Sequence, residues 1–216
     1  MRAVALTVVV LLATAGPGAQ QQPHTRLFPP QSLGLLEGPD RDAWQRPDQI
    51  MDALQIGENS VVADLGAGGG WFTVRLARHV GPNGLVYAED IQPEMVEAIE
   101  RRMNREHLTN VKTTRGTADD PKLPPGALDA VLIVDAYHEI EHPATLLRNV
   151  RTALKPTGVV AIVNFKKDGG GPGPSMEERI DPERVIADAR AAGLALRKRE
   201  NFLRYQYMLI FGPAPR

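Results

Sequence analysis

Short apolar runs alternate with longer amphipathic stretches over the middle of the chain, and this alternation constrains the fold more than any other feature. Five runs fit buried strands, at residues 61–64, 85–90, 111–116, 130–135 and 159–165. Helical stretches lie between them, at residues 71–80, 93–108 and 143–154. Strands joined through helices form parallel sheets that are covered on both faces. The sequence therefore predicts a doubly wound α/β fold with a mostly parallel sheet.

The C-terminal part departs from this alternation. Asp181 fits a helix N-cap, Pro182 fits the first helical position, and Gly193 fits the stop. Two strands follow, at residues 194–200 and 205–211, with only a short connection between them. So short a connection cannot make a parallel crossover. We therefore predict an antiparallel hairpin at the end of the sheet.

The first 19 residues have the composition of an export signal. Arg2 supplies a positive start, and the apolar run at residues 3–15 is short for a helix that spans a bilayer. Small residues at Ala13 and Ala15 fit a cleavage site. We therefore predict that residues 1–19 are a signal peptide and that the protein is secreted or periplasmic. The alternatives are an uncleaved membrane anchor, or a cytoplasmic protein with a misassigned start.

The region after the signal divides into an arm and one domain. Residues 20–41 are rich in Gln, Pro and Gly and have little periodicity, so we predict a linker or a loosely docked arm. The domain then covers residues 42–216 and begins with an amphipathic helix at residues 42–54, interrupted at Pro47.

Charge and cysteine content exclude several classes of protein. The 216-residue chain has 25 Lys and Arg against 26 Asp and Glu. This balance does not favour nucleic acid or an acidic membrane as a partner. The chain has no cysteine, which excludes disulfides, thiolate metal sites and cysteine nucleophiles.

A glycine-rich run, Asp64-Leu65-Gly66-Ala67-Gly68-Gly69-Gly70, joins the first strand to the first helix. Open α/β sheets bind ligands at this position, and glycines let the backbone come close to the ligand. A dinucleotide fingerprint that starts at Gly66 needs glycine where Trp71 stands. The Asp64 carboxylate would also repel a pyrophosphate and attract an ammonium group. A nicotinamide-dependent oxidoreductase is therefore the weaker interpretation.

Further acidic residues follow the second and third strands. Asp90 ends the second strand beside the glycine-rich run, where a carboxylate accepts hydrogen bonds from ribose hydroxyls. Its neighbour Glu89 is expected to point to the other side of the strand. The run Gly116-Thr117-Ala118-Asp119 follows the third strand and could cover an adenine, with the Asp119 carboxylate accepting a hydrogen bond from the adenine amino group. The alternative is that this run is a solvated loop.

Four motifs together resemble the class I S-adenosylmethionine-dependent methyltransferases. They are Asp64-x-Gly66-x-Gly68-x-Gly70, the run of residues 86–95 (VYAEDIQPEM), Leu123-Pro124 ahead of Leu128-Asp129-Ala130-Val131, and Leu154-Lys155-Pro156-x-Gly158. The resemblance covers about residues 42–212 and implies a Rossmann-like, seven-stranded sheet that ends in an antiparallel hairpin. It implies S-adenosylmethionine as cofactor, with the methionine part at Asp64 and the glycines, the ribose at Asp90, and the adenine at Ala118 and Asp119. The implied cofactor-binding residues are Asp64, Gly66, Ala67, Gly68, Gly70, Asp90, Ile91, Ala118, Asp119 and Asp135.

The acceptor side is predicted at the end of the fourth strand, in the run of residues 135–142 (DAYHEIEH). His138 is the candidate general base for an acceptor that loses a proton, and Tyr137 or Glu139 is the candidate to orient it. The alternatives are a core histidine at His138 and a first-turn helix charge at Glu139. A metal held by His138, His142 and Glu139 is disfavoured because Pro143 starts the helix only after them, so no metal is predicted.

The identity of the acceptor stays open. In the family, the lead-in helix often forms a lid, which makes Trp44 and Gln45 candidates for that role, with a core position for Trp44 as the alternative. The run of residues 80–87 also resembles protein isoaspartate methyltransferases, but their N-terminal substrate segment has no counterpart here. A small-molecule acceptor is therefore predicted. Protein carboxyl methylation and a non-catalytic exported nucleoside-binding protein are the alternatives, and the oligomeric state is not determined.

Overall fold

The computed structural model describes residues 27–215. The predicted signal peptide and the first part of the predicted arm lie outside these residues. None of the helices described between residues 27 and 215 is long and apolar enough to cross a membrane.

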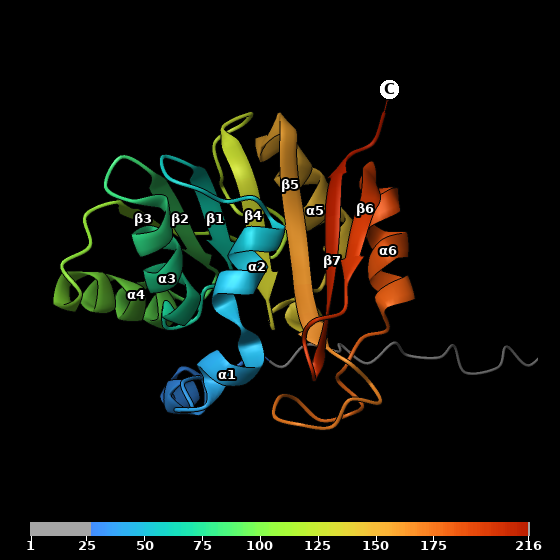
Figure 1. Cartoon of the computed structure of the whole chain (residues 1–216), viewed down its shortest axis with the longest axis horizontal. Helices are drawn as coiled ribbons and strands as arrows, with labels where there is room; N and C mark the ends of the chain where they lie inside the picture. The colour runs from blue at the N-terminus through green and yellow to red at the C-terminus, as the bar shows by residue number, and fades with distance from the viewer. Residues whose placement is uncertain (1–26, 216) are drawn as a thin grey trace, which may run out of the picture.

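The centre of the fold is one seven-stranded sheet with the order β3-β2-β1-β4-β5-β7-β6. Strands β1 to β5 run parallel, and β7 is antiparallel to both of its neighbours, β5 and β6. The predicted seven-stranded, mostly parallel sheet with a hairpin end is therefore confirmed (Figure 1). The strands are β1 Val61–Leu65, β2 Leu85–Asp90, β3 Val111–Arg115, β4 Leu128–Val134, β5 Leu154–Phe165, β6 Leu194–Glu200 and β7 Gln206–Pro213.

Helices cover both faces of the sheet, as predicted. The helices α2 (Pro47–Ala53), α3 (Trp71–Val80) and α4 (Pro93–Arg105) pack on one face, and α5 (Pro143–Ala153) and α6 (Pro182–Ala191) pack on the other (Figure 1). Alternate residues of each central strand supply the two cores, because successive side chains of a strand point to opposite faces. In β4, for example, Leu132 packs under α3, whereas Ile133 packs under α5.

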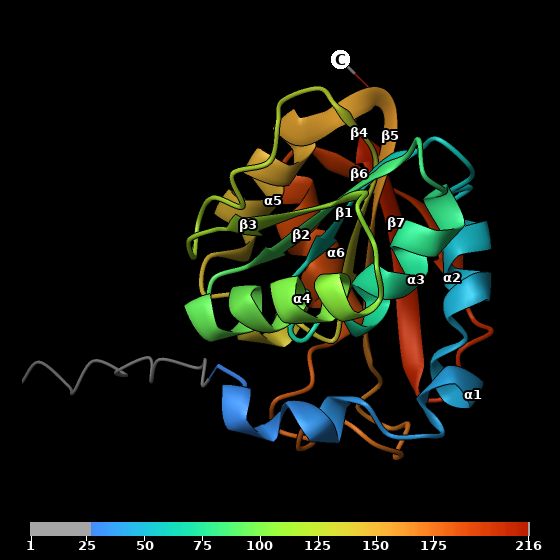
Figure 2. The same ribbon diagram turned by 90° about the vertical axis from the view of Figure 1, so that its left-hand side faces the viewer.

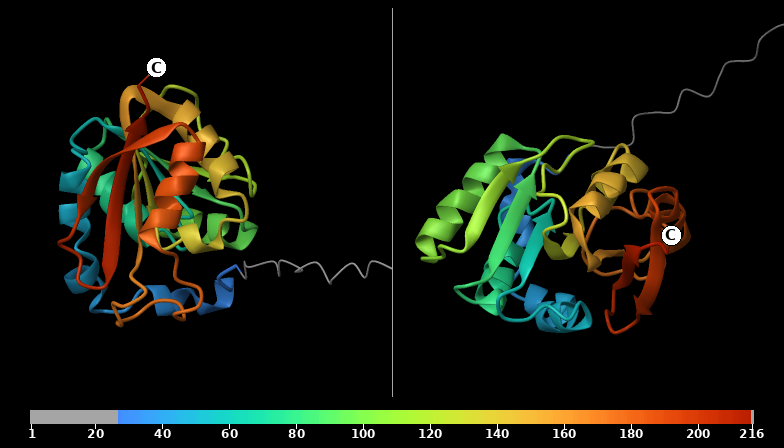
Figure 3. Two further views of the ribbon diagram at one scale, coloured as in Figure 1. Left: turned by 90° about the vertical axis from the view of Figure 1, so that its right-hand side faces the viewer. Right: turned by 90° about the horizontal axis from the view of Figure 1, so that it is seen from above.

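The carboxyl ends of the parallel strands form the edge where the glycine-rich loop lies. Residues 27–40, which we call the strap, run along this edge and contain the 3-10 helix η1 (Pro30–Leu36) (Figures 2 and 3). The short helix α1 (Arg41–Gln45) follows the strap and leads into α2. Residues 27–40 of the predicted linker or loosely docked arm are docked in the structure. The Phe28 backbone bonds to the side chains of Glu139 and Gln92, and Glu37 pairs with Arg102.

Gly66 and Gly126 offer a matched test of close packing at this edge. Both have a left-handed backbone, with φ of 70° at Gly66 and 64° at Gly126. A Cβ at Gly66 would lie 2.5 Å from the Cβ of Ala136, whereas a Cβ at Gly126 meets nothing within 4 Å. We expect Gly126→Ala to lower the free energy of unfolding by about 1 kcal/mol. Gly66→Ala should lower it by about 1 to 3 kcal/mol more, because the loop and the end of β4 must move apart.

Urea denaturation of the two variants and the unchanged chain measures this difference. Equal losses would mean that the close approach between the glycine loop and the end of β4 does not constrain the fold.

Candidate functional site

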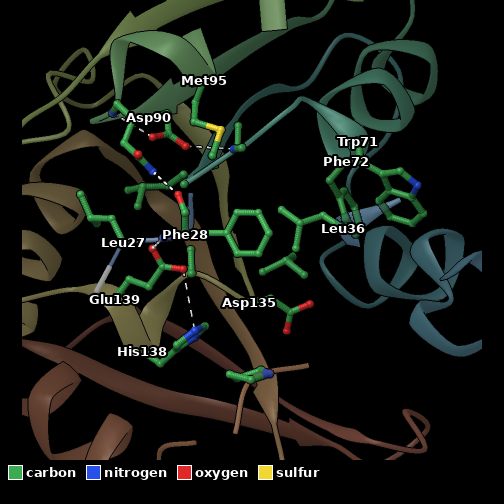
Figure 4. Close-up of a pocket in the computed structure, with 18 of the residues that line it drawn as sticks. Leu27, Phe28, Leu36, Trp71, Phe72, Asp90, Met95, Asp135, His138 and Glu139 are labelled. Atoms are coloured by element: carbon green, nitrogen blue, oxygen red, sulfur yellow. Dashed lines mark hydrogen bonds and ion pairs between the residues drawn. The ribbon is translucent and has the colours of Figure 1, made fainter. Parts of the chain in front are cut away.

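One large cavity, of about 790 Å³, opens at the carboxyl edge of the sheet. Its walls come from the ends of β1, β2 and β4, from the strap and α1, and from the loop after β5 (Figure 4). Ten of the residues predicted for the site line this cavity: Asp64, Gly66, Ala67, Gly68, Asp90, Ile91, Ala118, Asp135, His138 and Glu139. The structure therefore places the predicted cofactor-binding residues and the predicted acceptor-side residues around one cavity.

Asp64 lies at the base of the glycine-rich loop. Its carboxylate is buried and accepts a hydrogen bond from the Thr73 hydroxyl at 2.6 Å. Burial raises the pKa of Asp64 to about 6. Beyond it, Gly66 and Gly68 adopt positive φ, so the loop backbone faces the cavity without intervening side chains.

Asp90 and Glu89 both face the cavity from the end of β2. The Asp90 carboxylate accepts from the backbone N–H groups of Gly68 and Gln92, each at 3.0 Å, and burial raises its pKa. Glu89 was expected on the other side of the strand from Asp90 and was given no role in the site, but its side chain also lines the cavity. Its carboxylate accepts from the Gly66 N–H at 3.4 Å, and a side chain at Gly116 would collide with it. Burial raises the pKa of Glu89 to about 8.

Two predicted cofactor residues lie outside the cavity lining. Asp119 is exposed and accepts a hydrogen bond from His142 at 2.8 Å, so Thr117 and Ala118 line the cavity at this end without it. Gly70 forms the N-cap of α3, and a Cβ there would contact Ile99 on α4 at 3.5 Å. Its positive φ serves the turn into the helix.

His138 and Glu139 line the opposite end of the cavity. Their side chains approach to 3.8 Å, between His138 Nε2 and Glu139 Oε1. Burial lowers the pKa of His138 and raises that of Glu139 to about 7, so the imidazole is neutral near neutral pH. In the described part of the chain, His138 Nδ1 and Asn164 Nδ2 are the two buried side-chain atoms without a hydrogen-bond partner.

Tyr137 does not belong to the acceptor side as predicted. It is 1% exposed, and its hydroxyl donates to Asp188 of α6 at 3.1 Å. Residues 137–139 form a short 3-10 turn, which directs Tyr137 into the core under α5 and α6 while His138 faces the cavity.

A buried polar network that the sequence analysis did not predict connects α1 to the end of β4. Arg41 Nε donates to Gln45 at 3.1 Å, Gln45 donates to Gln206 at 2.8 Å, and Gln206 donates to Asp135. Arg41 Nη2 lies 3.8 Å from Asp135. Burial raises the pKa of Asp135 to about 6. Gln45 was predicted only as part of a lid, and Gln206 lies 161 residues further along the chain.

The strap is the second feature that sequence reasoning missed. The Phe28 N–H donates to Glu139 at 2.9 Å, and its carbonyl accepts from the Gln92 side chain at 3.0 Å. The Phe28 ring lies between the Asp90 end and the His138 end of the cavity (Figure 4). At the other end of the strap, Glu37 pairs with Arg102, which also donates to the Gly69 carbonyl at 2.9 Å. The strap is therefore fixed to both halves of the site.

The cavity combines many buried acids with one guanidinium. Five carboxyl groups with raised pKa values line it: Asp64, Glu89, Asp90, Asp135 and Glu139. Among the described residues, Arg41 is the only Lys or Arg in the lining. Because burial destabilises the ionised acids, a positively charged ligand stabilises them, and the cavity favours cations.

The sequence profile of the methyltransferase domain family matches residues 62–158, from β1 into β5. A SAM-dependent methyltransferase from Aquifex aeolicus has the same fold, with a TM-score of 0.81 and 26% identity, over 86% of this chain and 98% of that one. Together, the family match and the shared fold support a class I S-adenosylmethionine-dependent methyltransferase. The cofactor of these proteins is S-adenosylmethionine (SAM), and its sulfonium and ammonium groups suit the acidic cavity.

Two bacterial relatives match part of this chain. The Ubiquinone/menaquinone biosynthesis C-methyltransferase of Proteus mirabilis is 29% identical over 126 residues, 57% of this chain and 49% of that protein. The Demethylmenaquinone methyltransferase of a Geobacillus species is 27% identical over 113 residues, 52% of this chain and 48% of that protein. The chain thus spans about half the length of these relatives.

The raised carboxyl pKa values predict that the preference for SAM over S-adenosylhomocysteine (SAH) depends on pH. SAM carries a positive sulfur that SAH lacks. As the pH rises through about 6 to 8, Asp64, Asp135, Glu139 and Glu89 ionise and attract that charge more strongly. The ratio of SAM to SAH affinity should therefore rise severalfold between about pH 5.5 and about pH 8.5.

Calorimetric titration of both ligands at each pH measures this ratio, and a constant ratio would contradict the prediction.

The same carboxyl groups should make the ligand-free protein less stable as the pH rises. Because their pKa values are raised by folding, the free energy of unfolding should fall as pH rises from the usual carboxyl range to about 8.

Proposed function

We propose that this protein transfers the methyl group of SAM to a small apolar acceptor with a phenol-like aromatic ring. The observation that carries the proposal is the layout of the cavity at the carboxyl edge of the sheet, with the acidic glycine loop at one end and the neutral His138 imidazole at the other. When bound, SAM supplies a methyl group already activated on a positive sulfur. The residues of the protein therefore act mainly by positioning the two reactants.

The residues around the glycine loop fit the parts of SAM in the order that the family resemblance implies. Gly66 and Gly68 expose backbone beside Asp64, which attracts the ammonium group of the methionine part. Asp90 has a carboxylate at the rim of the same loop for the ribose hydroxyls. Thr117 and Ala118 form the wall for the adenine.

Arg41 is suited to hold the carboxylate of the methionine part. Its guanidinium stacks on Trp71, with 4.1 Å between the guanidinium carbon and the ring centroid, directly beyond the glycine loop. Within the described structure, its Nη2 has Asp135 at 3.8 Å and donates no hydrogen bond. An anion at this position would therefore gain a donor without breaking an existing hydrogen bond.

The acceptor end of the cavity supports an apolar aromatic acceptor. Trp44 and Phe165 form a wall, with ring centroids 5.7 Å apart, and Pro172 and Pro174 extend it. Flat aromatic molecules pack well on such surfaces. The two bacterial relatives are named for methylation in quinone biosynthesis, which agrees with an aromatic acceptor. The strap covers the cavity, which disfavours a polypeptide acceptor.

His138 is placed to remove the proton that a phenol-like acceptor loses when it gains the methyl group. Its imidazole is neutral because burial lowers its pKa, so it accepts a proton at neutral pH. Glu139, at 3.8 Å, stabilises the imidazolium that forms. The acceptor gains a methyl group, SAM leaves as SAH, and the proton moves to His138.

Turnover by the purified chain tests the proposal. SAM is mixed with panels of phenols, hydroquinones, amines and carboxylates, and SAH release is measured. We expect release with phenolic or hydroquinone acceptors. His138→Ala should slow this turnover by roughly 10²- to 10⁴-fold, and less at high pH, where the acceptor ionises unaided. His142→Ala is the matched control, because His142 is exposed and pairs with Asp119 outside the cavity lining.

Equal rates for the two histidine variants at every pH would exclude His138 as the base. Binding of SAH without turnover of any acceptor in the panels would favour the non-catalytic binding protein instead.

A further inference from the structure

The exposed apolar side chains of the structure are not evenly distributed. In residues 27–215, four large apolar side chains are exposed: Leu27 by 39%, Leu35 by 81%, Met176 by 45% and Leu196 by 36%. Leu27 and Leu35 belong to the strap, and Met176 belongs to the loop after β5. Both segments lie at the carboxyl edge of the sheet (Figures 1 and 2). Three of the four therefore belong to the two segments that line the cavity at this edge.

Leu196 lies at the other edge of the sheet. It is on the edge strand β6 and pairs with Phe211 of β7, which pairs with Val160 in the middle of β5. Leu196 is thus a natural control for apolar exposure away from the mouth.

The rim of the mouth is continuous with the cavity and is held in place. Leu27 and Leu35 line the cavity and also face solvent. On the opposite side, Pro172 and Pro174 line the cavity close to Met176. Arg179 fixes this loop, because its guanidinium donates to the carbonyls of residues 166, 170, 172 and 174 and stacks on Phe165. These bonds give the rim a defined shape.

The chain outside the described structure ends at this same rim. Residues 3–15 form the apolar run, and residues 16–26 connect it to Leu27. Eleven residues reach at most about 40 Å when fully extended. If residues 3–15 are retained in a bilayer, the mouth of the cavity therefore stays close to the bilayer surface.

We propose that the mouth of the cavity docks on a lipid bilayer, with Leu27, Leu35 and Met176 inserted at its surface. Exposed apolar patches of this kind mark membrane or protein contacts, and apolar side chains at a rim insert into the headgroup boundary. The chain has nearly equal numbers of basic and acidic residues, so apolar contact rather than attraction to anionic lipid drives the docking. Together with the proposed function, docking implies an acceptor that dissolves in the membrane and enters the cavity from it.

Single-cysteine labels test the docking in the full chain, because the sequence has no cysteine of its own. Leu35→Cys, Met176→Cys and Leu196→Cys are each labelled with an environment-sensitive fluorophore and mixed with phosphatidylcholine vesicles. We expect a blue shift, and quenching by lipids with spin-labelled chains, at positions 35 and 176 and not at 196. Unchanged spectra at all three positions, or equal shifts at all three, would overturn the proposal.

A second measurement separates the rim from the apolar N-terminal run. The described fold lies entirely within residues 27–215, so a chain that starts at residue 20 keeps every described contact. In this shortened chain, Met176→Glu combined with Leu35→Glu should lower vesicle binding at least tenfold, and Leu196→Glu should leave it within about twofold. Equal binding by all three proteins would overturn the proposal.

SAH binding by the same preparations keeps the two hypotheses distinguishable. If SAH binds but the vesicles do not, the methyltransferase site stands and the docking surface fails. If the vesicles bind through positions 35 and 176 but SAH does not bind, the docking surface stands and the proposed function fails.

Discussion

Burial of five carboxyl groups around one cavity is the constraint on which the rest of the site depends. Desolvation raises the pKa of each group, and their mutual repulsion adds to this effect at Asp64 and Glu89. Such a cluster is stable only where donors from the backbone and from nearby side chains satisfy it. The glycine loop supplies backbone N–H groups to Glu89 and Asp90, and Thr73 supplies a hydroxyl to Asp64. The remaining negative potential suits a ligand with a positive sulfur and an ammonium group.

The same constraint explains why distant segments converge on the site. Asp135 is held by Gln206 from β7 and faces Arg41 from α1, so the lead-in helix and the C-terminal hairpin both stabilise one buried carboxylate. Glu139 takes the N–H of Phe28 in the strap. Hydrogen bonds to buried carboxylates therefore connect the glycine loop, the end of β4 and the strap that covers the cavity.

The sequence predicted the parts of this arrangement that depend on local pattern. The alternation of strands and helices, the glycines at positive φ and the position of Asp90 are readable because each follows from residues close together in the chain. The strap, the Gln45–Gln206 bond and the inward turn of Tyr137 were not predicted. They depend on contacts between residues that are 111, 161 and 51 positions apart in the sequence, respectively. Local sequence patterns give no information about contacts over such separations. Asp119 was assigned to adenine from its place in a loop, but in the structure its carboxylate accepts a hydrogen bond from His142, the N-cap residue of α5.

The acidic cavity at the carboxyl edge of the sheet suits SAM and SAH rather than a dinucleotide. Calorimetric titration of the purified chain with SAH, and separately with NAD, tests this claim most directly. We expect saturable binding of SAH and no detectable heat with NAD at the same concentrations. Binding of NAD without binding of SAH would contradict it.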